Sequence, residues 1–315
     1  MTKKDILLMS PPASEKLGDD LAARFNVIRW WEAEDKPALL AKLAGHLQLI
    51  ATTGHSGPDA DVIAALPKLQ LIASFGVGYD GIDIAAARQH GVKVTNTPDV
   101  LNDCVAELAL GLMIALARDM VNADQYTRAG RWARDGNYPF QDELTGKVVG
   151  ILGLGRIGKE IARRAQAFRM QVVYHGRSAQ VDEPYRYYPD LVQMARDVDW
   201  LVVIAPSAAG THHLVDAAVL DALGRDGRLI NVARGSLVDE AALVAALQNG
   251  TIKGAGLDVF EDEPRPNPAL LTLSNVILSP HAGTATHRTR RIMGDLVMAN
   301  LEAHLRGDPL RSPVV

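Results

Sequence analysis

The chain has 315 residues, of which 48% are hydrophobic and 22% are charged, and its formal net charge is −4. This composition is typical of a soluble globular protein with one large or two ordinary domains. The charge balance, without any Lys/Arg-rich run, argues against nucleic acid as a partner. The apolar runs are too short for a membrane span or a signal peptide. The single cysteine, Cys104, cannot form an internal disulfide, so we expect a reducing, cytoplasmic location.

Residues 1–100 alternate short apolar runs with amphipathic segments. We predict helices at 14–25 and 36–47, and strands at 6–10, 26–30, 47–52, 69–75 and 92–96. Strands that alternate with helices indicate a parallel sheet covered by helices on both faces.

The segment 102–120 has the longest apolar helix pattern, with Asn102 or Asp103 as its expected N-cap. Residues 127–147 have no clear period, and we interpret them as a helix tail and an ordered loop. A second alternating series follows. Its predicted helices are 156–168, 238–250 and 291–307, and its predicted strands are 148–153, 171–175, 199–205, 227–233, 254–260 and 275–279. The sequence therefore predicts an α/β fold of two Rossmann-like domains with a cleft between them.

A glycine-rich turn, GLGRIG, lies between the strand predicted at 148–153 and the helix predicted at 156–168. In this context Gly153 allows a tight turn, Gly155 lets the backbone approach a pyrophosphate, and Gly158 lets the helix pack on the strand. The helix N-terminus then presents N–H groups to the anion. The residues assigned to cofactor binding here are Gly153, Leu154, Gly155, Arg156, Ile157 and Gly158.

The strand predicted at 171–175 ends without the acidic residue that NAD-binding folds place about 20 residues after the glycines. That acid would accept a hydrogen bond from the adenine ribose 2′-OH. Gly176, Arg177 and Ser178 follow instead. A carboxylate would repel a 2′-phosphate, whereas a guanidinium can pair with it and a serine hydroxyl can donate to it. We therefore predict NADP(H) as the preferred cofactor and NAD(H) as the alternative, with Arg177 and Ser178 at the 2′-phosphate.

Three residues suited to carbonyl reduction follow three predicted strands. Arg234 follows 227–233, Glu263 follows 254–260, and His281 follows 275–279. Because ligands bind beyond the carboxyl ends of parallel strands, we expect these residues near the cofactor. A guanidinium can bind a carboxylate, and a histidine can protonate a nascent alkoxide. A carboxylate beside the histidine favours the charged imidazole.

Taken together, these motifs resemble the D-isomer-specific 2-hydroxyacid dehydrogenases, and among them the NADPH-dependent glyoxylate/hydroxypyruvate reductases. The matching stretches are GVGYDGID (76–83), NTPDVLNDCVAELALGLMIALAR (96–118), GKVVGILGLGRIG (146–158), INVARGSLVDEAALVAAL (230–247), GAGLDVFEDEP (254–264) and SPHAG (279–283). The resemblance implies reduction of small 2-oxo acids, with glyoxylate and hydroxypyruvate favoured and an aryl-pyruvate as the alternative. It also implies a discontinuous substrate-binding domain (1–98 and 286–315), a dinucleotide-binding domain (99–285) and an active site in the cleft between them.

The resemblance also implies individual roles. Arg234 would orient the substrate, His281 would be the acid/base, and Glu263 would be its partner. Val77 and Gly78 would bind the substrate carboxylate through their backbone N–H groups. The remaining residues implied at the cofactor are Pro206, Ala233, Asp258, His281 and Gly283. A homodimer built around 102–145 is expected as well.

Other functions fit the sequence less well. No paired Cys/His spacing indicates a metal site, and the adjacent His212 and His213 should point apart on any regular element. Ser236 has no nucleophile elbow around it, which argues against a hydrolase. A cofactor-sensing corepressor can share the fold and the catalytic residues, but no partner motif is evident. Trp132 and Tyr138 are expected either to reach a substrate pocket across a dimer or to serve packing.

Overall fold

The structure is a computed structural model that describes residues 3–207 and 209–315. The chain divides into two compact units: unit 1 is Met1–Leu101 with Thr284–Val315, and unit 2 is Asn102–Gly283. The sequence predicts these boundaries at 98/99 and 285/286. Among the described residues, no helix has both the length and the apolar character needed to cross a membrane.

Unit 1 is built on a parallel sheet of five strands in the order β2-β1-β3-β4-β5. The strands are β1 (Asp5–Leu8), β2 (Asn26–Arg29), β3 (Leu49–Thr53), β4 (Leu71–Phe75) and β5 (Lys93–Thr95). β3 and β4 are almost entirely buried, as expected for strands covered on both faces.

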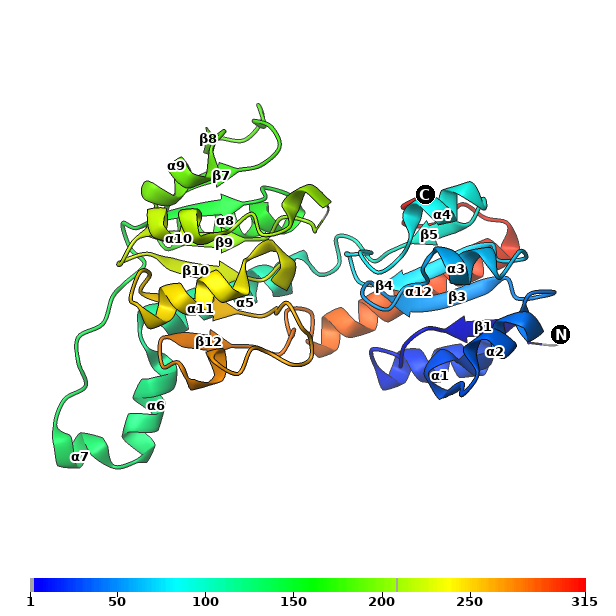
Figure 1. The fold of residues 1–315 in the computed structure, drawn as a ribbon, viewed down its shortest axis with the longest axis horizontal. Helices are drawn as coiled ribbons and strands as arrows, with labels where there is room; N and C mark the ends of the chain where they lie inside the picture. The colour runs from blue at the N-terminus through cyan, green and yellow to red at the C-terminus, as the bar shows by residue number, and fades with distance from the viewer. Residues whose placement is uncertain (1–2, 208) are drawn as a thin grey trace. The chain divides into compact units, whose positions relative to one another are not determined.

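Helices cover both faces of this sheet (Figure 1). They are α1 (Glu15–Arg24), α2 (Lys36–Leu43), α3 (Ala60–Ala64), α4 (Ile84–Gln89) and α12 (His287–Arg306). α1 and α12 pack together on one side, and a core cluster on the other joins α2, α3 and α4. The chain itself specifies the ends of α12: the Thr286 hydroxyl accepts the Thr289 N–H at its start, and Gly307 adopts the left-handed conformation at its end. α12 therefore begins earlier than the predicted residue 291.

Unit 2 contains a parallel sheet of seven strands in the order β12-β11-β10-β9-β6-β7-β8. The strands are β6 (Val148–Leu152), β7 (Gln171–His175), β8 (Arg186–Tyr188), β9 (Trp200–Val203), β10 (Arg228–Asn231), β11 (Gly254–Leu257) and β12 (Val276–Leu278). The chain runs from β6 outward through β7 to β8, and then returns to β9 on the other side of β6. The point between β6 and β9 is thus the topological switch point, where this class of sheet binds ligands. The predicted parallel α/β fold is confirmed.

The helices of unit 2 form two layers and an extension. The layers consist of α5 (Asn102–Ala117) and α8 (Arg156–Ala167) on one face, and α9 (Leu191–Arg196), α10 (Ala217–Leu223) and α11 (Glu240–Gln248) on the other. α6 (Met120–Arg128) and α7 (Arg131–Asp135) extend away from the sheet (Figure 1). We refer to residues 118–145 as the arm.

The single helix predicted over 102–120 is wrong at its end. α5 stops at Ala117, and Asp119 takes a left-handed conformation with φ 49° before α6 begins. The Asp119 carboxylate accepts hydrogen bonds from Asn122 Nδ2 at 2.6 Å and from Tyr138 Oη at 2.5 Å, which hold the break. The predicted N-cap is also wrong, because α5 begins at Asn102 itself, whose buried Oδ1 has no hydrogen-bond partner.

Several predicted strands are longer than the observed ones at their carboxyl ends. The strand predicted at 254–260 ends at Leu257, and the one predicted at 199–205 ends at Val203. Val259 and Phe260 beyond the first end are buried, and Ile204 and Ala205 beyond the second are partly buried against the core, so composition alone does not separate them from the strand. β8 was not predicted, since it is only three residues long.

Candidate active site in unit 2

Most of the residues assigned to chemistry lie beyond the carboxyl ends of the unit 2 strands. The glycine turn follows β6, Arg177 follows β7, Arg234 follows β10, Glu263 follows β11, and His281 follows β12. Because these strands are parallel neighbours, their carboxyl ends share one edge of the sheet. The fold of unit 2 therefore presents the proposed cofactor and catalytic residues on the same edge.

The glycine turn has the geometry that a dinucleotide requires. Gly153 has φ 104°, and a Cβ there would meet the backbone of Ala205 at 2.7 Å, across the switch point. A Cβ on Gly158 would lie 2.2 Å from Gly153 O, so only glycine lets α8 approach this closely. A Cβ on Gly155 would meet nothing within 4 Å, which leaves this backbone open at the N-terminus of α8. These residues fit a diphosphate, although the Leu154 side chain is buried in the core.

The loop after β7 carries no acidic residue at the position where one would accept a hydrogen bond from the ribose 2′-OH. Arg177 and Ser178 are both exposed on it, and Gly176 leaves open space beside them. A guanidinium and a hydroxyl are thus accessible where the 2′-substituent of an adenine ribose binds in this fold. The chemistry of this loop fits NADP(H).

His281 and Glu263 form a hydrogen-bonded pair. His281 Nδ1 lies 2.7 Å from Glu263 Oε2, and both side chains are about one-third exposed, at 33% and 29%. The other carboxylate oxygen of Glu263, Oε1, accepts the Phe260 N–H at 3.1 Å, which fixes the carboxylate against its own loop. A carboxylate on Nδ1 leaves Nε2 as the nitrogen that can exchange a proton with a substrate.

Asp258 shapes the loop that carries His281. Its carboxylate accepts hydrogen bonds from Ser279 Oγ at 2.5 Å, Ala282 N at 2.7 Å and Gly283 N at 2.9 Å, and the residue is 2% exposed. Its carbonyl oxygen also accepts the His281 N–H at 2.8 Å. His281 itself adopts a left-handed conformation, with φ 51°. Asp258 thus holds a turn that this histidine would not favour by itself, while its expected contact with the nicotinamide stays a prediction.

Arg234 is placed by two neighbours that the sequence did not single out. Asn231, 1% exposed, donates from Nδ2 to Arg234 O at 2.9 Å and accepts the Ala233 N–H at 3.1 Å through Oδ1. A Cβ on Gly235 would lie 2.0 Å from the Phe260 carbonyl group, so glycine brings the Arg234 loop against the loop of Glu263. A buried asparagine at the end of an apolar strand is a signal that could have identified Asn231.

The loop after β9 carries another predicted cofactor contact, Pro206. Pro206 is exposed, and the neighbouring Ser207 Oγ lies 3.3 Å from Ser236 Oγ, which joins this loop to the Arg234 loop. The expectation that His212 and His213 point apart is wrong: their rings stack with centroids 3.8 Å apart. His213 has φ 52° in a turn, so the geometry of a regular element does not apply.

Val77 and Gly78 belong to unit 1, in the loop after β4. Asn96 Nδ2 donates to Val77 O at 2.8 Å, and a Cβ on Gly54 would lie 2.2 Å from Gly78 O. This close backbone packing holds the loop in one position.

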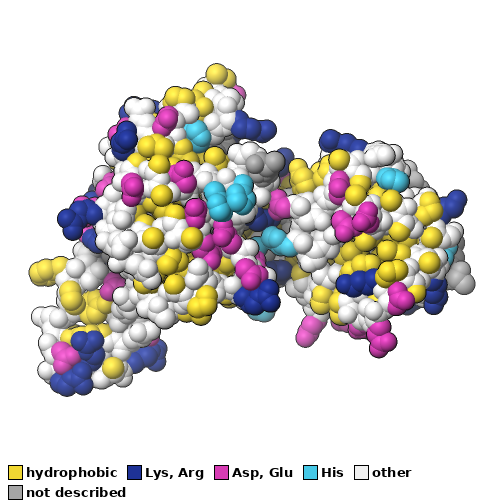
Figure 2. Space-filling model, viewed as in Figure 1, with side chains coloured by type: hydrophobic (Ala, Val, Ile, Leu, Met, Phe, Trp, Pro, Cys, Tyr) yellow, Lys and Arg dark blue, Asp and Glu magenta, His cyan; other side chains and the backbone are white. Residues whose placement is uncertain are grey.

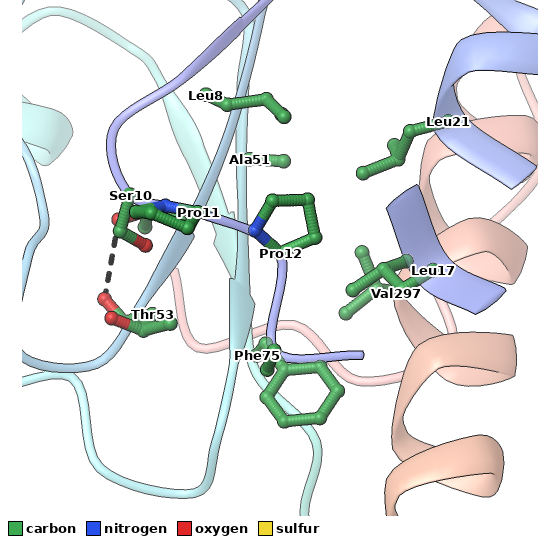
Figure 3. A pocket seen from close by; sticks show the side chains of 12 residues that line it. Leu8, Ser10, Pro11, Pro12, Leu17, Leu21, Ala51, Thr53, Phe75 and Val297 are labelled. Atoms are coloured by element: carbon green, nitrogen blue, oxygen red, sulfur yellow. Dashed lines mark hydrogen bonds between the residues drawn. The ribbon is translucent and has the colours of Figure 1, made fainter. Parts of the chain in front are cut away.

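An apolar pocket lies in the same unit, between β1, β3, β4, α1 and α12, with Pro12 and Phe75 among its lining (Figure 3). Its lining, all within the described residues, includes no charged side chain, and we assign it no catalytic role.

The arm has its own internal packing and an apolar surface. Tyr138 is hydrogen-bonded to Asp119, and its ring packs edge-on against Tyr126 at 5.1 Å, so it serves the arm's structure. Burial, and then the Asp119 carboxylate, raise the pKa of Tyr138 to about 12. Hydrophobic side chains nevertheless remain exposed along the arm (Figure 2), namely Met120, Val121, Trp132 and Phe140.

Known proteins share both the sequence and the fold. Residues 110–283 match the family described as D-isomer specific 2-hydroxyacid dehydrogenase, NAD binding domain. Two relatives are 45% identical over 309 residues, which is 98% of this chain and 98% of each relative: a glyoxylate/hydroxypyruvate reductase A of Arabidopsis thaliana and a hydroxyphenylpyruvate reductase of Plectranthus scutellarioides. The structure of an NADPH-dependent glyoxylate/hydroxypyruvate reductase of Sinorhizobium meliloti, in complex with NADP and malonate, has a TM-score of 0.93 at 45% identity, over 100% of this chain and 97% of that one. The chain therefore belongs to the D-isomer-specific 2-hydroxyacid dehydrogenase family.

Proposed function

We propose that this protein is an NADPH-dependent reductase of small 2-oxo acids, with glyoxylate and hydroxypyruvate as substrates. The observation that carries the proposal is the 2.7 Å hydrogen bond between His281 and Glu263, in the unit that also presents the glycine turn and Arg177. The names of the Arabidopsis and Sinorhizobium relatives support this substrate class and the cofactor.

Each residue has a distinct task in this proposal. Arg234 binds the substrate carboxylate and orients the neighbouring carbonyl, together with the backbone N–H groups of Val77 and Gly78. The reduced nicotinamide, when bound, supplies a hydride to the carbonyl carbon. His281 transfers a proton from Nε2 to the carbonyl oxygen, which becomes the hydroxyl of the product. Glu263 keeps Nδ1 hydrogen-bonded, which orients the imidazole ring and leaves Nε2 as the nitrogen that transfers the proton.

A panel of 2-oxo acids with each nicotinamide cofactor tests this function, with the absorbance of the reduced cofactor as the signal. We expect turnover of glyoxylate and hydroxypyruvate, and a higher kcat/KM with NADPH than with NADH. Arg177→Ala should lower the NADPH/NADH ratio of kcat/KM by at least about tenfold, since a charge-assisted hydrogen bond contributes about 1.5–3 kcal/mol and each 1.4 kcal/mol is a factor of about ten. The proposal fails if no 2-oxo acid is reduced, or if Arg177→Ala leaves the ratio unchanged.

Reduction of an aryl-pyruvate is the second candidate, and the similarity to the Plectranthus hydroxyphenylpyruvate reductase favours it. The same panel separates the two candidates when it includes hydroxyphenylpyruvate. A kcat/KM for that acid above the values for glyoxylate and hydroxypyruvate would assign the aryl substrate.

We place the protein in the cytoplasm, in keeping with its one buried cysteine, which forms no disulfide. A homodimer formed through the arm is also part of the proposal. The exposed apolar side chains of the arm, Trp132 and Phe140 above all, support such a contact. Light scattering after size-exclusion chromatography should give twice the chain mass for the wild type. Phe140→Asp should shift the mass toward that of one chain.

A further inference from the structure

The loop after β7, residues 176–180, is tied down at both ends. At one end Tyr187 Oη donates to Gly176 O at 3.1 Å. At the other end the Gln180 backbone N–H donates to Tyr174 Oη at 2.6 Å. Arg177 lies between these two ties and is exposed. The backbone of the loop is therefore fixed while its cationic side chain remains accessible.

The anchors of this loop belong to the sheet. Tyr174 on β7 is 1% exposed and pairs in register with Tyr187 on β8. The centroids of their rings lie 5.4 Å apart. The short edge strand β8 thus has a clear consequence for the site, because it supplies one of the two hydroxyl anchors.

Gln180 makes one more contact, which reaches the glycine turn. Its side-chain Nε2 donates to Leu154 O at 2.7 Å. In a planar trans peptide the carbonyl of one residue and the N–H of the next point in opposite directions. Holding Leu154 O on the Gln180 side therefore directs the Gly155 N–H away from it. A Cβ on Gly155 would meet nothing within 4 Å, so this residue lies in the open part of the turn.

We propose that Gln180 is a positioning residue that couples the two phosphate-binding parts of the cofactor site, an inference that rests on the proposed use of NADPH. Through its side chain it orients the Leu154–Gly155 peptide of the glycine turn. Through its backbone it fixes the end of the loop that carries Arg177. The amide touches no cofactor atom in this proposal. It determines affinity, and the preference for a 2′-phosphate, by holding two protein segments at a fixed separation.

The test is cofactor binding measured by isothermal titration calorimetry, with NADPH, NADH and 2′,5′-ADP as probes. Gln180→Ala should raise the Kd for NADPH and 2′,5′-ADP about tenfold and the Kd for NADH only about threefold, because NADH lacks the phosphate that Arg177 binds. Gln180→Glu preserves size but places an acceptor oxygen against Leu154 O, and it should weaken all three probes at least as much. The adjacent Val181→Ala is the matched control, because Val181 is 95% exposed, and it should change each Kd less than twofold.

Kinetics and stability provide a readout that a general structural defect would not produce. Gln180→Ala should raise the KM for NADPH while kcat at saturation and the melting temperature stay near the wild-type values. The inference is overturned if Gln180→Ala binds all probes within twofold of the wild type, or if NADPH and NADH weaken equally. If the wild type binds no NADPH, or if Arg177→Ala leaves 2′,5′-ADP binding unchanged, the proposed cofactor preference itself fails. Failure of the Gln180 inference is thus seen in the Gln180 variants, whereas failure of the cofactor preference is seen in the wild type and in Arg177→Ala.

Discussion

Removing the Asp258 carboxylate should release the loop that presents His281. The carboxylate is 2% exposed and accepts the N–H groups of Ala282 and Gly283. In Asp258→Ala both backbone donors lose their partner, at a cost of about 1–3 kcal/mol each, or about 2–6 kcal/mol together. The left-handed conformation of His281 adds roughly 1–2 kcal/mol of strain that favours relaxation. Since domains are stable by only about 5–15 kcal/mol, local opening of the loop is the expected response.

Hydrogen exchange measured without cofactor reports directly on the Ala282 and Gly283 amides. Because no nicotinamide is present, a loss of protection reflects the position of the loop and not a contact with the cofactor. We expect peptides covering 279–283 to lose protection in Asp258→Ala, and kcat to fall because His281 is no longer held. Asp258→Asn should lose less protection and less kcat than Asp258→Ala, since its Oδ1 can still accept a hydrogen bond while its amide nitrogen cannot. Asp262→Ala is the control on the same loop, because Asp262 is exposed and pairs only locally with Arg265. Unchanged protection of 279–283 in Asp258→Ala would refute this reasoning.

Three further predictions concern the same unit. His281→Ala should lower kcat by about 10²–10⁴, the usual contribution of a positioned general acid; near-wild-type turnover would exclude its role. The Lys253 ammonium and the Arg228 guanidinium lower the pKa of Asp142 from 3.8 to about 2, so this group stabilises the fold above about pH 4 and loses that effect as the pH falls toward 2. Urea unfolding should accordingly show that wild type and Asp142→Asn differ at pH 6 and converge toward pH 2; a constant difference contradicts the assignment. Gly235→Ala places a Cβ 2.0 Å from a neighbouring carbonyl group and should lower the melting temperature and activity together; a wild-type melt would show that the loops can separate freely.

The sequence alone was sufficient for the parallel α/β fold and for the family. Apolar runs alternating with amphipathic segments leave few other architectures, because each strand needs cover on both faces. Glycine spacing after a strand, and Arg177 in place of an acid, are local patterns that carry their own physical reason. These features depend on neighbours in the chain, which the sequence displays directly.

The tertiary structure decided how those residues are held. The break at Asp119 depends on Tyr138, which lies 19 residues away along the chain, and no local pattern predicts it. Asp258 binds the loop of His281, and Gln180 contacts Leu154, across separations of 24 and 26 residues. The last two contacts form because β11 lies beside β12, and β6 beside β7, in the sheet. Which side chain satisfies which backbone group is therefore settled by packing, whereas the presence of the sheet is already settled by the order of the residues.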